Sequence, residues 1–93
     1  MRVNYYATLR QAVGKKTEII DLKGSQTLGN LLHIIVEAHP SLTNELLDAD
    51  GTLQGHIRIF INGEDVSYQE VISELAVGQE DKVDIFPAIG GGK

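Results

Sequence analysis

The chain has 93 residues, a length that fits one domain with one modest hydrophobic core. It contains no cysteine, which excludes disulfides, thiolate metal sites and a cysteine nucleophile. The formal net charge of −5 argues against nucleic acid as a partner and is compatible with a partner that has a basic surface. The longest apolar run, Ile34 to Val36, is too short to span a bilayer, and the first residues do not resemble a signal peptide. We therefore expect a cytoplasmic protein with no membrane partner.

Two alternating segments open the chain. Residues 3–9 place every second side chain on the same face, with Val3, Tyr5, Ala7 and Leu9 on one side and Asn4, Tyr6 and Thr8 on the other. This period of two predicts a strand. Gly14 marks a turn, and residues 17–22 predict a second strand that forms a hairpin with the first.

The next segment predicts the main helix. Thr27 is a suitable N-cap, and it is followed by one apolar stripe at helical spacing, made of Leu28, Leu31, Leu32, Ile35 and Val36. His39-Pro40 is expected to end the helix, because the residue before a proline disfavours the helical conformation. Residues 42–47 predict one further short helical turn.

The second half of the chain predicts two more main strands. Asp48 to Gly51 is a loop, and it lacks the glycine that an EF-hand requires at its sixth place, so calcium is disfavoured. Residues 57–61 alternate as a strand before the tight-turn signal Asn62-Gly63, and residues 81–89 are predicted as the last strand, with Pro87 ending its regular pairing. Ser67 to Glu70 has the form of a capping box and predicts a short helical turn. The order of elements predicts an α+β protein of β-grasp type, with one mixed sheet packed on one main helix.

No group of side chains predicts an enzyme active site. The three histidines lack a zinc spacing, the carboxylates are scattered, and no serine or threonine lies in a nucleophile elbow. The sequence therefore predicts no metal site and no bound cofactor.

Two features remain unusual. The chain ends in Gly90-Gly91-Gly92-Lys93, a tail that adds no side chain to a core, after a domain that we expect to span residues 1–89. In addition, Tyr6, Phe60 and Phe86 should lie side by side on the face of the sheet away from the helix. A contiguous apolar patch usually marks an interaction site, so we predict a partner surface of these three rings with Pro87.

These features resemble the ThiS/MoaD/CysO family of β-grasp sulfur carriers, which are relatives of ubiquitin. The resemblance covers nearly the whole chain, and its most specific parts are "INGEDV" at 61–66 and "DKVDIFPAIGGG" at 81–92. It implies that an E1-like enzyme uses ATP to adenylate the carboxylate of Gly92. Sulfur then replaces an oxygen, and the resulting thiocarboxylate donates sulfur to a synthase large subunit or another acceptor enzyme, in molybdopterin, cysteine or related biosynthesis.

The sequence departs from the family pattern at its last residue. Lys93 blocks the Gly92 carboxylate by an amide bond, so the resemblance implies a C-terminal peptidase that removes Lys93. The alternatives are an added residue that is not native, or activation at the carboxylate of Lys93 itself.

Two other functions stay open at this point. A ubiquitin-like modifier would use the same activation and join Gly92 to lysines of target proteins. A non-covalent β-grasp binding module would instead have no use for the tail, and it would tolerate a bulky residue in place of Gly92.

Overall fold

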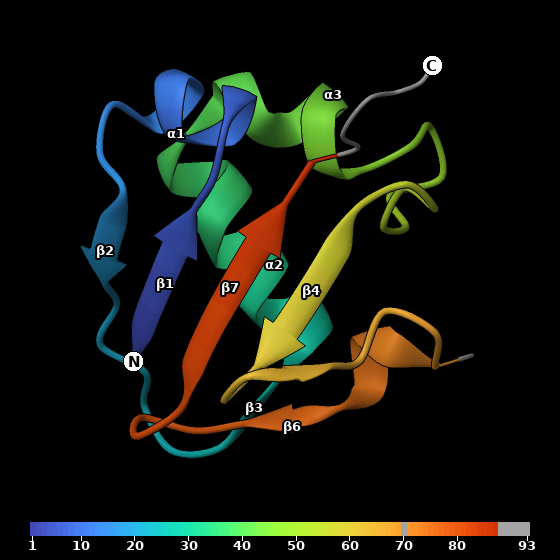
Figure 1. Cartoon of the computed structure of the whole chain (residues 1–93). Helices are drawn as coiled ribbons and strands as arrows, with labels where there is room; N and C mark the ends of the chain where they lie inside the picture. Colours follow the sequence, from blue (N-terminus) through green and yellow to red (C-terminus); the bar gives the residue numbers. More distant parts are fainter. Residues whose placement is uncertain (70, 88–93) are drawn as a thin grey trace.

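The computed structural model describes residues 1–69 and 71–87. The elements follow in the order β1 (Arg2–Tyr5), α1 (Thr8–Val13), β2 (Thr17–Ile19), β3 (Gln26–Thr27), α2 (Leu28–Ala38), η1 (Pro40–Leu42), α3 (Thr43–Leu46), β4 (Arg58–Ile61), β5 (Glu64–Asp65), η2 (Ile72–Glu74), β6 (Ala76–Val77) and β7 (Lys82–Phe86). The main sheet has five strands in the order β2-β1-β7-β4-β5, and β3 pairs with β6 in a separate small ribbon. Figure 1 shows α2 lying across one face of this sheet. The expected α+β fold with a mixed sheet on one main helix is thus confirmed.

The middle of the sheet joins the two halves of the chain. β1 and β7 run parallel with Val3 opposite Val83, while β4 pairs antiparallel with β7 with Ile59 opposite Ile85. These four side chains are fully buried and point toward α2. Because side chains alternate along a strand, the neighbours of these residues point to the other face, which α2 leaves open.

The main helix forms as its sequence predicts. The backbone N–H of Asn30 donates to the Thr27 hydroxyl at 3.1 Å, so Thr27 is the N-cap. All five side chains of the predicted apolar stripe are buried. The helix ends at Ala38, and the backbone N–H of His39 closes its last turn on Ile35. Burial of this stripe against the sheet supplies most of the helix's stability, because an isolated helix of this length is marginal in water.

Two predictions about secondary structure were wrong. The first strand ends at Tyr5, because Ala7 takes a left-handed φ of 54° and the chain turns into α1. Leu9 is buried as predicted, but it reaches the core from this short helix. Among residues 67–69 the structure has a single turn, in which the backbone N–H of Gln69 donates to the carbonyl oxygen of Val66 at 3.2 Å, and no helix; Glu70, the other half of the predicted capping box, lies outside the described residues. The Ser67 hydroxyl accepts from the backbone N–H of Ile59 at 2.6 Å. This bond gives β4 a hydrogen-bonding partner past the end of β5.

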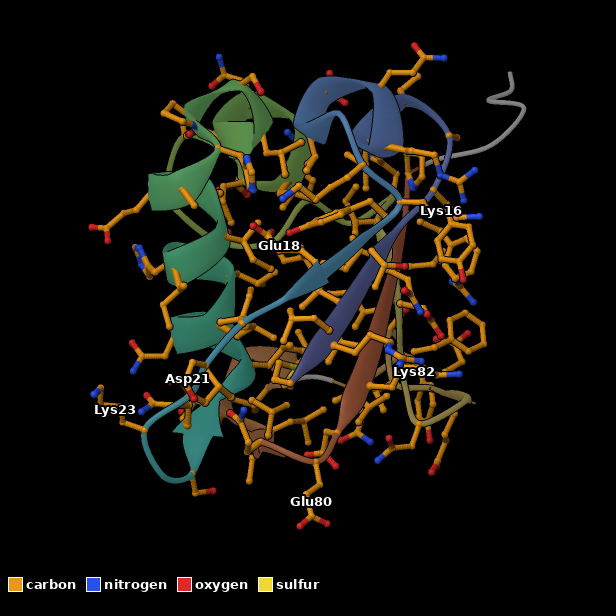
Figure 2. All side chains as sticks on the ribbon, turned by 90° about the vertical axis from the view of Figure 1, so that its left-hand side faces the viewer. Lys16, Glu18, Asp21, Lys23, Glu80 and Lys82 are labelled. Atoms are coloured by element: carbon orange, nitrogen blue, oxygen red, sulfur yellow. The ribbon has the colours of Figure 1, made fainter. Side chains whose placement is uncertain are left out.

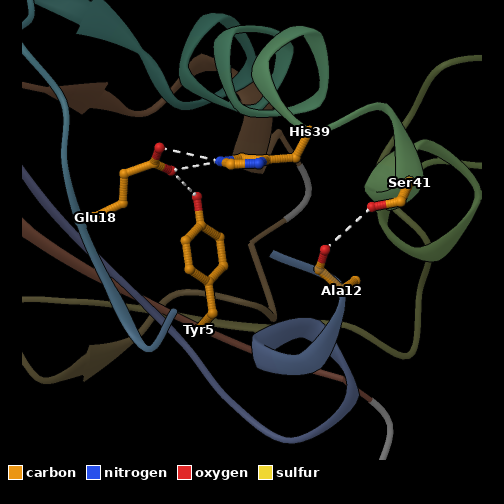
Figure 3. Close-up of polar contacts among 5 residues, drawn as sticks. All are labelled: Tyr5, Ala12, Glu18, His39 and Ser41. Atoms are coloured by element: carbon orange, nitrogen blue, oxygen red, sulfur yellow. Dashed lines mark hydrogen bonds and ion pairs between the residues drawn. The ribbon is translucent and has the colours of Figure 1, made fainter. Parts of the chain in front are cut away.

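A polar link fastens the end of α2 to the sheet. Figure 3 shows the Tyr5 hydroxyl donating to Glu18 at 2.7 Å, and Nε2 of His39 lying 3.0 Å from both oxygens of the same carboxylate. Burial alone would raise the pKa of Glu18, but the hydrogen bonds from Tyr5 and His39 bring it below its ordinary value. Burial first, and then the neighbouring Glu18, strongly raise the pKa of Tyr5. This link joins β1, β2 and the end of α2.

Candidate functional site

The three predicted aromatic rings meet on the open face of the sheet. Phe86 ends β7, Tyr6 follows β1, and Phe60 lies in β4 on the other side of β7. Phe86 stacks on Tyr6 with ring centres 4.1 Å apart and planes inclined by 11°. Phe60 meets Phe86 edge to face at 5.4 Å. We call Tyr6, Phe60 and Phe86 the aromatic cluster.

The strand register places the cluster at one end of the sheet. Tyr5 lies opposite Ile85 in the parallel pair, which brings Tyr6 beside Phe86. Phe60 lies opposite Asp84 in the antiparallel pair, so its ring reaches Phe86 along a diagonal. Each of the three rings is half-buried, because the rings cover one another. The cluster is therefore a compact apolar surface rather than three separately exposed side chains.

The last residues of the candidate site are described only in part. Pro87, which we predicted at the partner surface, is buried, so any effect on docking would come through its neighbours, and that role stays a prediction. Gly90, Gly91, Gly92 and Lys93, together with the expected domain end at residue 89, lie outside the described residues. Phe86 is the sixth residue before Gly92, and six extended residues span at most about 20 Å.

The carboxylate of Asp84, which was not among the predicted site residues, is hydrogen-bonded to the aromatic cluster. Asp84 is only 8% exposed although it points to the open face. Its Oδ1 accepts from the Asn4 amide at 2.7 Å and from the Tyr6 hydroxyl at 3.3 Å. Burial raises the pKa of Tyr6, and the Asp84 carboxylate raises it further. The Tyr6 hydroxyl thus stays a neutral donor, and this bond holds its ring over Phe86.

The short helix α1 adds a cation at the edge of the cluster. The guanidinium carbon of Arg10 lies 5.5 Å from the centre of the Tyr6 ring, which is cation–π distance. Its Nε also donates to the carbonyl oxygen of Tyr5 at 3.1 Å. Because the predicted first strand covered Thr8 and Leu9 and no helix was predicted after it, Arg10 could not be placed here from the sequence.

The remaining cations of the open face follow from strand alternation. Arg2, Arg58 and Lys82 are exposed and alternate with the buried residues of their strands. Figure 2 shows Lys82 on the side of the sheet away from α2, while Glu18 points toward the helix. Arg58 pairs with Asp65 at 2.6 Å in a partly exposed ion pair. Although the chain is acidic overall, its open sheet face is rich in cations.

The described residues hold no metal site and no membrane span. Within residues 1–69 and 71–87, no three His, Asp or Glu side chains gather closely enough to hold a metal ion. Across the same residues, no helix combines the length and the apolar character that a bilayer crossing requires.

Comparisons with known proteins found a matching family model and similar sequences. The family model described as the ThiS family matches residues 3–92. Small archaeal modifier protein 1 of Haloferax volcanii is 33% identical over 92 residues, which cover 99% of this chain and 100% of the relative. Small archaeal modifier protein 3 of the same organism is 26% identical over 92 residues, which cover 99% of this chain and 98% of the relative.

Solved structures agree with the sequence matches. A crystal structure of small archaeal modifier protein 1 from Haloferax volcanii has a TM-score of 0.85 at 32% identity, and the match covers 99% of this chain and 98% of that one. A chain in the crystal structure of the Amycolatopsis orientalis BexX/CysO complex has a TM-score of 0.76 at 26% identity, with 98% of each chain covered. Both structures match this chain over nearly its whole length.

Proposed function

This chain belongs to the ThiS family of small ubiquitin-like carrier and modifier proteins, and we propose that it is a sulfur carrier activated at the carboxyl group of Gly92. The observation that carries the proposal is the aromatic cluster, whose Phe86 ends β7 and lies six residues before Gly92 in the sequence. A surface at this place can dock on a partner while the glycines enter the partner's active site. Docking away from the reacting atoms then positions the carboxylate.

The proposed chemistry uses the chain terminus rather than a side chain. Once a peptidase has hydrolysed the Gly92–Lys93 bond, the free carboxylate attacks the α-phosphate of ATP in an E1-like enzyme and releases pyrophosphate. Hydrogen sulfide ion then displaces AMP from the acyl adenylate, which leaves a thiocarboxylate on Gly92. The glycines suit this step, because backbone without side chains can pass through a narrow channel. The match of the family model, which ends at Gly92, supports that residue as the activated one.

A second candidate function is favoured by the names of two relatives. Both Haloferax volcanii proteins are called modifiers, and one is 33% identical to this chain over nearly its full length. The same acyl adenylate could pass to a lysine amine of a target protein, which would form an isopeptide bond to Gly92. The two functions share their activation and differ only in the acceptor.

Mass spectrometry of the protein isolated from its own host tests both functions. For a sulfur carrier, we expect a form that ends at Gly92 with sulfur in place of one carboxylate oxygen. For a modifier, we expect branched tryptic peptides in which residues 83–92 are joined to a lysine of another protein, because trypsin cuts after Lys82. If every molecule retains Lys93 and carries neither mark, the protein is a non-covalent binding module instead.

A binding measurement tests the docking role of the aromatic cluster. The protein can be titrated into an E1-like enzyme from the same host, with Phe86→Ala compared with Ile19→Ala. Ile19 is 68% exposed and lies opposite Arg2 in β2, outside the cluster, so it serves as the matched control. We expect Phe86→Ala to weaken binding by about 1–3 kcal/mol and Ile19→Ala to have little effect. Equal affinities for both variants would refute docking through the cluster.

Replacing Gly92 separates covalent function from simple binding. In chains that end at residue 92, Gly92→Val should abolish the adenylation seen with Gly92, which can be followed as pyrophosphate release, while the affinity of the folded domain for the enzyme stays nearly unchanged. Full activation of this variant would refute the proposed path of the tail through a narrow channel.

A further inference from the structure

The chain has a second hollow surface that the proposed function does not use. A groove of about 350 Å³ lies between the first half of α2, the turn at residues 51–53 and the segment at residues 71–73. None of its lining residues belongs to the five-stranded sheet. The groove is therefore a surface separate from the aromatic cluster.

Close packing at the start of α2 shapes the groove. The backbone N–H of Leu28 donates to the carbonyl oxygen of Leu75 at 2.8 Å, which ties this helix end to the segment before β6. A Cβ added at Gly29 would lie 3.1 Å from Ser73, so the two segments approach as closely as glycine allows. The residues around η2 therefore form a fixed wall against the helix.

The interior of the groove is apolar. Leu32 and Leu47 are buried at its base, and Leu53 and Ile72 are half-buried along its sides. Val71, another lining residue, is 52% exposed. A partner side chain placed here would remove this apolar surface from water.

The chain segments that line the groove contain carboxylates but no Lys or Arg. The sequence contains no Lys or Arg from residue 24 to 57 or from 59 to 81, and these two stretches supply every lining residue. Three exposed carboxylates are immediate sequence neighbours of lining residues, namely Asp48, Asp50 and Glu74. Hydrogen bonds, chiefly from the Thr52 hydroxyl, hold the pKa of Asp48 below its ordinary value. The groove thus has acidic surroundings, in contrast to the cation-rich sheet face.

We propose that this groove is a second docking site, which receives an apolar side chain flanked by lysine or arginine from a partner protein. Its size is at the lower end of the range for small-molecule sites, and it is suited to one or two anchoring side chains. The acidic surroundings attract a basic segment and repel an acidic one. Because the two surfaces use different elements, one partner can occupy the groove while another holds the sheet face. The inference does not depend on the chemistry at Gly92.

Nuclear magnetic resonance on the full chain tests this site with three synthetic amphipathic peptides. One contains leucine and lysine, one leucine and glutamate, and one alanine and lysine. We expect only the leucine–lysine peptide to shift the amide signals of Leu32, Thr52 and Ile72, with signals of the aromatic cluster unchanged. Added salt should weaken this binding, because the attraction is partly between exposed charges.

Two variants provide a matched pair for the same titration. Val71→Ser should raise the dissociation constant of the leucine–lysine peptide about fourfold, since it removes two methyl groups of a side chain that is about half exposed before the peptide binds. Tyr68→Ser should leave it unchanged, because Tyr68 is 74% exposed but does not line the groove. The spectrum of each variant also shows whether the fold is kept.

Each of the other outcomes would overturn the proposal. Equal binding of the alanine–lysine peptide would show plain charge attraction, and equal binding of the leucine–glutamate peptide would show an apolar site without charge preference. Shifts confined to the sheet face would place the basic segment elsewhere. Shifts of the groove signals with protein concentration alone would identify a second copy of the chain as the occupant.

Discussion

Truncation of Phe86 gives the sharpest test of the aromatic cluster as a packed unit. Phe86 is the central ring, since it contacts both Tyr6 and Phe60, whereas Phe60 contacts only Phe86 among the aromatic pairs of the described residues. Each aromatic pair contributes about 0.5–1.5 kcal/mol beyond its buried area. Phe86→Ala should therefore lower the free energy of unfolding by about 1–3 kcal/mol through the two lost pairs. Phe60→Ala loses one pair and should cost about half as much.

Urea unfolding of four proteins measures these values. The set consists of the unmodified chain, Phe86→Ala, Phe60→Ala and the double variant, and it forms a double-mutant cycle. The coupling between Phe60 and Phe86 should be about 0.5–1.5 kcal/mol. A coupling near zero, or equal losses for the two single variants, would refute the central position of Phe86. Binding to the E1-like enzyme is then compared only under conditions in which every variant is folded.

Four further predictions test the rest of the fold. Leu32→Ala should lower the free energy of unfolding by about 2–5 kcal/mol, against much less for the half-exposed Ile34→Ala, and similar urea midpoints would contradict the core assignment. Thr27→Ala should cost about 1 kcal/mol through the lost N-cap, which helix content during thermal unfolding would report; an unchanged melting curve would count against the cap. Because the pKa of Tyr5 is raised in the folded protein, its contribution is complete below pH 10.0 and falls as the pH rises above this value, so Tyr5→Phe should flatten the alkaline loss of stability. Because the pKa of Glu18 is lowered in the folded protein, its contribution to stability is lost as the pH falls below the ordinary value of 4.5, and Glu18→Gln should flatten this acid loss. For either variant, a dependence of stability on pH like that of the unmodified chain would refute the assignment.

The sequence predicted the parts of the fold that depend on long periodic patterns. The stripe of α2 repeats over two turns and has a clear cap, so both its existence and its buried face could be recognised. The central strands alternate clearly, and their register then brings Tyr6, Phe60 and Phe86 together. This is why the aromatic cluster could be predicted before its geometry was known.

Other parts depended on contacts that a local pattern does not contain. α1 has only six residues and no side-chain cap, and its start relies on a left-handed φ at Ala7, a residue that rarely adopts one. Ser67 matched a capping box, but its hydroxyl bonds to Ile59 across the sheet edge instead. Strand alternation in the sequence is enough to place Lys82 on the open face, but the position of Arg10 beside Tyr6 depends on α1, which the sequence did not predict. The features around the aromatic cluster could therefore not be predicted from local sequence patterns.

Because β1 pairs with β7, the aromatic cluster can form only after the last strand has been synthesised. Asn4 and Asp84, which are 80 positions apart, are hydrogen-bonded in this pair. Until β7 has been made, β1 and β4 lack the strand that separates them, and Phe86 is not present to bridge Tyr6 and Phe60. An enzyme that recognises the assembled cluster would therefore not bind incomplete or unfolded chains. Under the proposed function, docking through the aromatic cluster would therefore select chains in which the whole sheet has formed.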